Sequence, residues 1–144
     1  LDVHQGDGTI DICQGDAQIF TCSIHSESNF PFEKKKGWMD IALPAGTKDK
    51  TYLDFLSQTL ESIEAFITPD LVLFDAGIDV YTDDGLGNLE LSIEGIRKRD
   101  QLVFEHYRGK DIPVATVIGG GYSKDTQELA HRHGLIFESA INYL

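Results

Sequence analysis

Four short runs of apolar and β-branched residues have the composition of β-strands. They lie at 18–25, 38–43, 71–74 and 114–118, and proline or glycine residues follow most of them. The last two runs are apolar at almost every position, which is typical of strands buried on both faces of a parallel sheet. Residues 1–4 have a similar character, and we expect a fifth strand there.

Segments with helical periodicity separate these runs. Apolar residues recur every three or four positions over about 50–67, which predicts a helix with one buried stripe. A second helix is predicted over about 93–108, with Ser92 as its N-cap and Gly109 at its end. A helical tail closes the chain, and we expect an interruption at Gly134.

Strands that alternate with helices predict an α/β fold, in which a parallel β-sheet is flanked by helices. The 144 residues correspond in length to one domain. Because the only methionine is Met39 and the chain opens on strand-like residues, we expect residues 1–144 to be part of a larger single domain. In such folds the chemistry gathers beyond the carboxyl ends of the strands.

Composition narrows the classes of partner. The 24 acidic residues outnumber the 12 Lys and Arg residues, and a net charge of −12 argues against nucleic-acid binding. No apolar run is long enough for a membrane span, and no secretion signal is visible. Cys13 and Cys22 show neither CxxC spacing nor the density of a disulfide scaffold, so we expect a reducing, cytoplasmic environment.

Polar residues stand at the ends of predicted strands. Asp2 and His4 are two positions apart, so their side chains leave an extended chain on the same face, and Asp79 follows the 71–74 run. One imidazole and two carboxylates can hold a divalent metal ion and leave one position open, as in catalytic zinc sites. Iron and manganese also accept these ligands.

Each of these residues also has a purely structural interpretation. An aspartate at a strand end often caps a turn, and a lone histidine in a strand usually makes an ordinary hydrogen bond. The three glycines before Tyr122 can serve only close backbone approach, and Tyr122 itself can serve packing. His131 and His133 are two positions apart on a predicted helix and face different ways, which excludes them as a ligand pair.

Three blocks of sequence together resemble the signature motifs of the zinc-dependent histone deacetylase superfamily. The blocks are Asp2-Val3-His4-Gln5-Gly6-Asp7-Gly8, then Gly77-Ile78-Asp79 with Asp84-Gly85-Leu86-Gly87, and finally Gly119-Gly120-Gly121-Tyr122. They occur in the family's order and cover nearly the whole chain, which strengthens the expectation of a metal site. Gln5 and the segment 91–100 are most similar to the class IV branch and its bacterial relatives.

The resemblance implies an arginase/deacetylase-like sheet and a set of residue roles. The expected strand order is 114–118, 71–74, 1–4, 18–25 and 38–43. Asp2, His4 and Asp79 match the zinc ligands of the family. Tyr122 matches the tyrosine whose hydroxyl binds the substrate carbonyl oxygen as it becomes an oxyanion, and Asp7 matches a carboxylate that orients a catalytic histidine.

Other matches concern the substrate tunnel. Phe30 and Leu86 match apolar residues that line the acyl-lysine tunnel, and Gly120 and Gly121 belong to the same wall. Asp83 stands where the family more often has glycine, so we expect an altered tunnel rim.

A further match concerns monovalent cations. Ser23 and the carbonyl group of Ile24 match a buried site for an ion such as K⁺. Weaker matches at Cys13, Asp16 and Ile19 suggest a second such site.

The resemblance implies a zinc hydrolase that removes acyl groups from amines, with acyl-lysine in proteins as the leading substrate. Acetylpolyamines and other small acylated amines remain open. The family's paired catalytic histidines lie upstream of the Asp2 block, so we expect the chain to be inactive alone. We also expect self-association, or another chain that supplies the missing strands and the histidine pair. The alternatives are a non-catalytic metal-binding or interaction module and, less favoured, an arginase-like manganese hydrolase.

Overall fold

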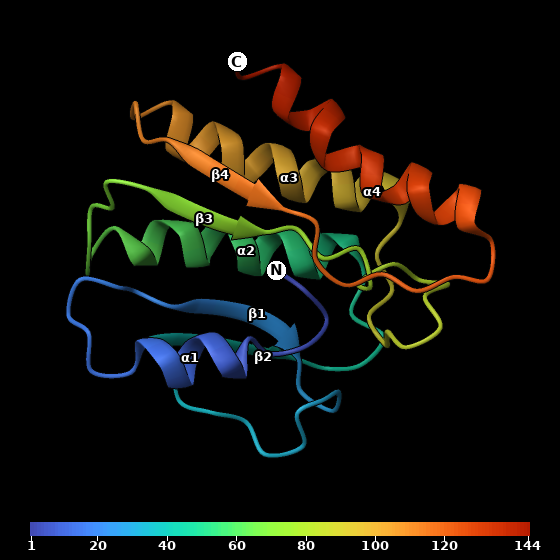
Figure 1. Ribbon diagram of the computed structural model, residues 1–144, viewed down its shortest axis with the longest axis horizontal. Coiled ribbons are helices and arrows are strands. Elements are labelled where there is room, and N and C mark those ends of the chain that lie inside the picture. The colour runs from blue at the N-terminus through green and yellow to red at the C-terminus, as the bar shows by residue number, and fades with distance from the viewer.

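Two pairs of parallel strands, with helices packed around them, make up the architecture (Figure 1). The computed structural model describes residues 1–144. Its elements in order are α1 (Asp7–Cys13), β1 (Cys22–Ser26), β2 (Met39–Leu43), α2 (Asp49–Ile63), β3 (Val72–Asp75), α3 (Ile93–Arg108), β4 (Val114–Val117) and α4 (Thr126–Ile141). β1 pairs with β2, and β3 pairs with β4, both in parallel. The structure therefore confirms parallel strands flanked by helices.

Residues 1–4 lie between the two strand pairs but do not form the predicted strand. The amino group of Leu1 donates to the carbonyl oxygen of Asp75 at 3.0 Å, and the N–H of Ser26 donates to the carbonyl of Val3 at 2.9 Å. The N–H of Val3, however, donates to the carboxylate of Asp79 at 2.8 Å instead of to a neighbouring strand. The segment lies between the two strand pairs, as expected, but the carboxylate of Asp79 takes the place of a backbone hydrogen bond between strands. The predicted order of five strands in one sheet is therefore wrong, because the sheet is divided into two pairs.

Three helices also differ from the sequence predictions. α1 was not predicted because Ile10 is its only buried residue, so it has no apolar stripe. α2 ends at Ile63, and one further turn reaches Ile67, whose N–H donates to the carbonyl of Ile63 at 3.0 Å. α4 runs through Gly134 without a break, because Leu135 and Ile136 anchor it in the core.

The main core lies where α2 and α3 pack beside β3. The buried stripe of α3 includes Ile96, Val103 and Phe104, and the ring of Phe104 meets that of Phe74 edge to face. Ser92 caps α3 as predicted, because its hydroxyl accepts a hydrogen bond from the N–H of Gly95 at 3.0 Å. Packing and capping thus hold α3 against the strand that leads toward Asp79.

The face of the β3–β4 pair that points away from α3 is uncovered. Leu73 is 78% exposed and Val117 is 61% exposed, so the prediction that both strands are buried on two faces is wrong for this chain. The physical reason is that the chain places helices on only one face of the β3–β4 pair. The apolar composition of the strands remains, with nothing in the chain packed on it.

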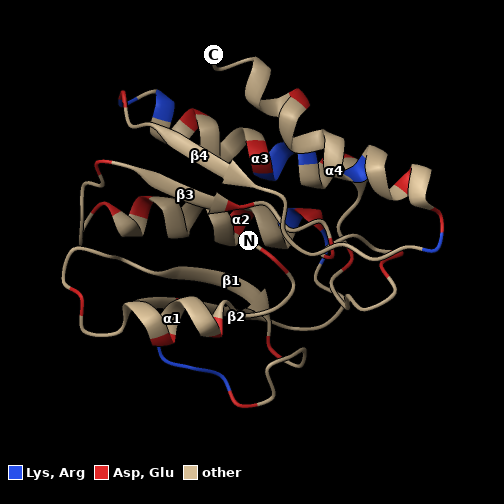
Figure 2. Cartoon of the chain, in the orientation of Figure 1, with Lys and Arg blue, Asp and Glu red and all other residues tan.

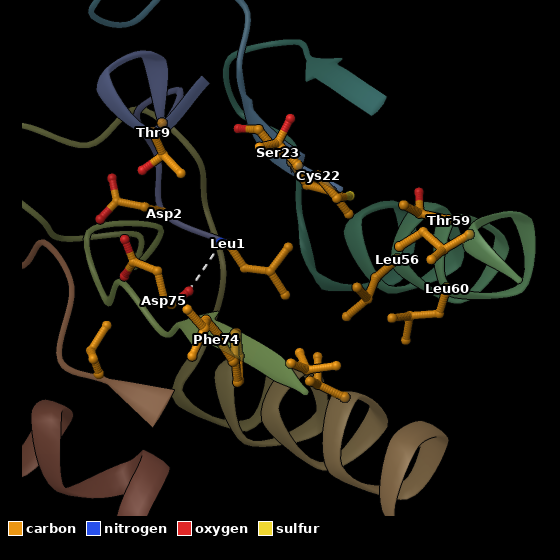
Figure 3. A pocket seen from close by; sticks show the side chains of 18 of the residues that line it. Leu1, Asp2, Thr9, Cys22, Ser23, Leu56, Thr59, Leu60, Phe74 and Asp75 are labelled. Atoms are coloured by element: carbon orange, nitrogen blue, oxygen red, sulfur yellow. Dashed lines mark hydrogen bonds between the residues drawn. The ribbon is translucent and has the colours of Figure 1, made fainter. Parts of the chain in front are cut away.

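A cavity of about 600 Å³ separates β1 from β3 (Figure 3). We call it the inter-sheet cavity. Its wall is mainly apolar and includes Cys22 and Ile24 of β1, Leu56 and Leu60 of α2, and Leu73 and Phe74 of β3. At one end it reaches Asp2 and His4, so the candidate metal ligands border this cavity.

Acidic residues occur in many segments of the chain, whereas basic residues are fewer (Figure 2). The longest basic run is Lys34–Lys36, in the loop between β1 and β2. None of the helices combines the length and the apolar character that crossing a membrane requires.

Candidate metal centre

Asp2, His4 and Asp79 converge at the carboxyl ends of the strands. One ligand atom from each residue lies within 4.8 Å of the others. The ring Nδ1 of His4 is 2.9 Å from Asp2 Oδ1 and 3.1 Å from Asp79 Oδ2. The structure therefore brings together the three residues that the sequence selected, although they come from segments more than seventy positions apart.

Backbone N–H groups fix both carboxylates. Asp2 Oδ1 accepts from the N–H of His4 at 2.9 Å, and Asp2 Oδ2 accepts from the N–H of Gly120 at 2.8 Å. Asp79 Oδ1 accepts from the N–H of Val3 at 2.8 Å. Three N–H groups from two chain segments thus hold the carboxylates in position.

The second carboxylate oxygen of Asp79 indicates a cation-binding site. Asp79 is completely buried, yet its Oδ2 atom has no hydrogen-bond partner; the ring Nδ1 of His4 lies 3.1 Å from it. An unsatisfied buried carboxylate oxygen is costly. Ligand atoms around a tetrahedral zinc ion lie about 3.3 Å apart at the usual bond lengths. The spacing and the chemistry of these three groups fit a divalent metal ion.

The two carboxylates differ in their electrostatics. Burial, reinforced by the negative charge of Asp2, raises the pKa of Asp79 to about 7. Burial would also raise the pKa of Asp2, but hydrogen bonds from the N–H groups of His4 and Gly120 bring that pKa below its usual value. Two buried carboxylates in contact repel each other, and a bound cation would relieve that repulsion.

The glycine run before Tyr122 lies directly against these ligands. A Cβ atom on Gly120 would overlap carboxylate oxygens of both Asp79 and Asp2. The carbonyl of Gly120 also accepts from the N–H of Ile78 at 2.7 Å. Gly121 packs beside Ile78 and His133. The close approach of the backbone to the two carboxylates therefore requires glycine at position 120, as the structural interpretation of the glycine run predicted.

Tyr122 follows this run, and Asp84 holds its backbone. The N–H of Tyr122 donates to Asp84 Oδ2 at 2.7 Å, while Asp84 Oδ1 accepts from the N–H groups of Leu86 and Gly87 at 3.0 Å. The side chain of Tyr122 is accessible, since the residue is 43% exposed. Asp84 thus links Tyr122 to the Leu86 loop. The sequence analysis treated Asp84 only as part of a motif, although an aspartate before Gly85 and Gly87 is a signal for such a turn.

The two predicted tunnel residues outside the glycine run lie in loops that a hydrogen bond joins. Phe30 and Leu86 are both exposed. The side-chain amide of Asn29 donates to the carbonyl of Leu86 at 2.9 Å, which joins the two loops. Asp83, in the loop beside Leu86, is exposed as well.

The remaining predicted site residues are not members of the ligand group. Asp7 is the first residue of α1 and does not belong to the ligand group. Ser23 and Ile24 lie in β1 and line the inter-sheet cavity, where Figure 3 shows Ser23. The hydroxyl of Ser23 is hydrogen-bonded to Nδ1 of His25 at 3.0 Å.

The other histidines do not join the metal ligands either. His25 is buried within β1, His106 on α3 pairs with Glu64, and His133 on α4 packs near Gly121. Burial lowers the pKa of His25, His106 and His133. No second histidine of this chain lies beside His4 as a proton-transfer partner.

Sequence reasoning missed Arg99, which approaches both ligand-bearing segments. It is completely buried on α3 and donates to the carbonyl oxygens of Leu1 and Gly77. A signal was present, since Arg99 and Asp100 interrupt the apolar stripe between Ile96 and Val103. Charges in such a position are rarely buried unless they are paired.

Comparisons with known proteins identify the family of this chain. The family model described as the histone deacetylase domain matches residues 1–135. An uncharacterised protein of Picosynechococcus is 44% identical over 97% of this chain, and histone deacetylase 2 of Arabidopsis thaliana is 33% identical over 94%. The chain spans 47% and 38% of the lengths of these two relatives.

A solved structure has the same architecture. The crystal structure of an HDAC homolog from Aquifex aeolicus superimposes with a TM-score of 0.80 and 28% identity, over 96% of this chain and 40% of that one. This likeness confirms the predicted deacetylase-like α/β fold. It also shows that the chain corresponds to a part of that larger architecture.

Proposed function

The chain belongs to the histone deacetylase family, and on this basis we propose that it forms the metal-binding part of a zinc-dependent amidohydrolase. The reaction is removal of acetyl or other acyl groups from lysine side chains or related amines. The observation that carries the proposal is the convergence of Asp2, His4 and Asp79 beside Gly120, which stands two residues before Tyr122. Members of this family are generally metal-dependent.

Asp2, His4 and Asp79 would hold the ion through two carboxylates and one imidazole. A zinc ion supplies Lewis acidity to a carbonyl oxygen and to a water molecule. The chain contributes the preformed geometry: the N–H groups of Val3, His4 and Gly120 already orient the two carboxylates. Little reorganisation is then needed on binding.

Tyr122 would act on the substrate carbonyl. Its hydroxyl would donate a hydrogen bond to the oxygen as negative charge develops there. The backbone bond from Tyr122 to Asp84 and the glycine run against Asp79 fix where this residue leaves the main chain. Phe30 and Leu86, on the exposed rim joined by Asn29, would contact the aliphatic part of an acylated amine.

A proton-transfer group is still needed, and none of the other histidines of this chain lies beside His4. We propose that the remainder of a larger protein or a second chain supplies a histidine pair, and that residues 1–144 alone are inactive. Asp7, in the first turn of α1, would orient such a histidine. Ser23 and Ile24 would hold a monovalent cation near Asp2, because all three line the same cavity.

The experiment is hydrolysis by the intact gene product of two probes, an acetyl-lysine peptide and an acetylated polyamine. We expect release of acetate that a chelator abolishes and added zinc restores. The two probes distinguish acyl-lysine from small acylated amines as substrates. Residues 1–144 alone should show no turnover, and strong turnover by the purified chain would contradict the proposed need for an external base.

A second function is favoured by one observation, the separation of every other histidine from the metal ligands. The protein would then be a non-catalytic metal-binding module. Stoichiometric zinc in the intact gene product, without turnover of either probe, would favour this module over the hydrolase.

A further inference from the structure

Arg99 is a charged side chain placed in the hydrophobic core. It lies on the buried stripe of α3, it is 0% exposed, and its guanidinium carbon stands 5.8 Å from the centre of the Phe74 ring. A buried cation is strongly unfavourable unless charges and hydrogen bonds compensate for it. The contacts of Arg99 therefore show what the fold gains from this placement.

One side of the guanidinium is held by the neighbouring residue. Nε of Arg99 donates to Asp100 Oδ1 at 2.8 Å, and Nη2 lies 2.8 Å from the same oxygen. Asp100 is also completely buried. This pair neutralises the charge and fixes the plane of the guanidinium, so that its remaining nitrogen has a defined direction.

The other side reaches the two segments that carry the metal ligands. Nη1 donates to the carbonyl oxygen of Leu1 at 2.9 Å and also to that of Gly77. Leu1 directly precedes Asp2 in the chain, and Gly77 stands two residues before Asp79. A single nitrogen atom thus joins segments separated by 76 positions, immediately before their ligands.

We infer that Arg99 is a positioning residue for the metal centre, one that ties the two ligand-bearing segments together and thereby sets the affinity for the ion. The inference rests on the proposed metal site. Arginine suits the role because its planar fork can bind Asp100 and the two carbonyls simultaneously. A lysine has a single nitrogen, which cannot hold the carboxylate while it spans both carbonyls.

The competing explanation is that Arg99 and Asp100 form an ion pair that only stabilises the fold. Substituting each residue of the pair separately distinguishes this explanation from a positioning role. Arg99→Lys retains the charge but loses the bridge between the carbonyls of Leu1 and Gly77. Asp100→Asn breaks the ion pair, yet it leaves an oxygen for Nε and leaves both carbonyl bonds in place. If Arg99 only contributes stability, the two variants should behave alike.

The test measures zinc affinity by competition with a chelating dye in the intact gene product, together with the melting temperature of the metal-free protein. We expect Arg99→Lys to weaken zinc binding by about tenfold to a hundredfold, the usual cost of losing a group that supports metal ligands. Asp100→Asn should lower the melting temperature but leave zinc affinity within about twofold. Arg97→Lys, at an arginine of the same helix that pairs with Glu138, should likewise leave zinc affinity unchanged.

The spectrum of the cobalt-substituted protein gives an independent readout, since it responds to ligand geometry and not to global stability. It should change in Arg99→Lys and stay unchanged in Asp100→Asn. If Arg99→Lys does not fold, the double variant Arg99→Gln with Asp100→Asn removes both charges and the carbonyl bridge together. The same loss of zinc affinity is then expected.

Equal zinc affinities of the wild type and Arg99→Lys, or equal losses in Arg99→Lys and Asp100→Asn, would overturn the inference. The proposed function would survive that result, provided that the wild type binds one zinc ion and Asp79→Asn does not. A wild type that binds no zinc would overturn both.

Discussion

The two ends of the gap between the strand pairs differ sharply. At the end where residues 1–4 lie, polar bonds cross the gap: Leu1 to Asp75, Val3 to Ser26 and to Asp79, and Asp2 to Gly120. At the other end the gap widens into the inter-sheet cavity, which is mainly apolar. The ligand end is joined within this chain, whereas the cavity end is left open.

This contrast shows that ligand placement does not require a continuous sheet. Backbone N–H groups of the chain orient the carboxylates, and Arg99 binds the carbonyl oxygens of Leu1 and Gly77 in the two segments that carry them. The uncovered strands β3 and β4 have the composition of a buried sheet but lack a covering layer. The chain therefore brings the proposed metal ligands together although one face of β3 and β4 has no covering layer.

The largest effect is expected at the ligand end, from Asp79→Asn. The substitution removes an anionic ligand from a buried site, so bound zinc should fall from about one ion per chain to a small fraction of that. Elemental analysis of the purified protein measures it. The matched control is Asp83→Asn, which removes an exposed carboxylate from the adjacent loop and should keep its zinc. Unchanged zinc in Asp79→Asn would exclude Asp79 as a ligand.

Tyr122→Phe tests the catalytic role at the same end. The metal and the fold should remain, while kcat in the intact gene product should fall by about a hundredfold to a thousandfold, because only the donor to the developing oxyanion is lost. Steady-state kinetics on the acetyl-lysine peptide measures this. Tyr143→Phe removes a hydroxyl that binds Glu105 and should leave kcat unaltered. A Tyr122→Phe enzyme within twofold of wild type would make Tyr122 a packing residue.

Leu73→Ala tests the cavity end. In residues 1–144 alone the exposed side chain should contribute less than about 0.5 kcal/mol to the free energy of unfolding. If the intact gene product covers this face, the same change should cost about 2–4 kcal/mol there. Denaturant unfolding of both forms measures the difference. Leu56→Ala, in the existing core, should be costly in both forms. Equal small effects of Leu73→Ala would show that the face stays uncovered.

The smallest expected effect is a pH dependence of the metal-free protein. Burial raises the pKa of Asp79 to about 7 from the ordinary aspartate value of 3.8. The folded state then binds the proton more tightly than the unfolded state does, and stability is lost as pH rises from about 4 to about 7. Relative to Asp79→Asn, the wild type should lose more than about 1 kcal/mol of unfolding free energy over this range.

Urea unfolding in the presence of a chelator, at several pH values, measures that difference. The asparagine variant is its own control, because it resembles the protonated acid and cannot ionise. A constant difference between the two proteins across the range would show that Asp79 is not protonated more readily in the folded state.

Local patterns in the sequence determined the parts of the fold that depend on near neighbours. The apolar stripe of α3, its Ser92 cap and the parallel strand segments were predictable because spacing and capping act within a few residues. Asp2, His4 and Asp79 could also be selected, since each stands in a recognisable motif and Asp79 follows a predicted strand. The resemblance of three blocks to one family then placed them in a single site.

Tertiary structure alone decided the rest. Whether residues 1–4 form a strand depended on the carboxylate of Asp79, which takes the N–H of Val3 from 76 positions away. The exposure of Leu73 depended on which layers the chain contains, because the same apolar composition occurs whether or not a partner layer is present. The role of Arg99 depended on two carbonyl groups meeting in space. The local sequence determines which hydrogen-bonding and apolar groups are present. Only the folded chain determines which distant groups become their partners.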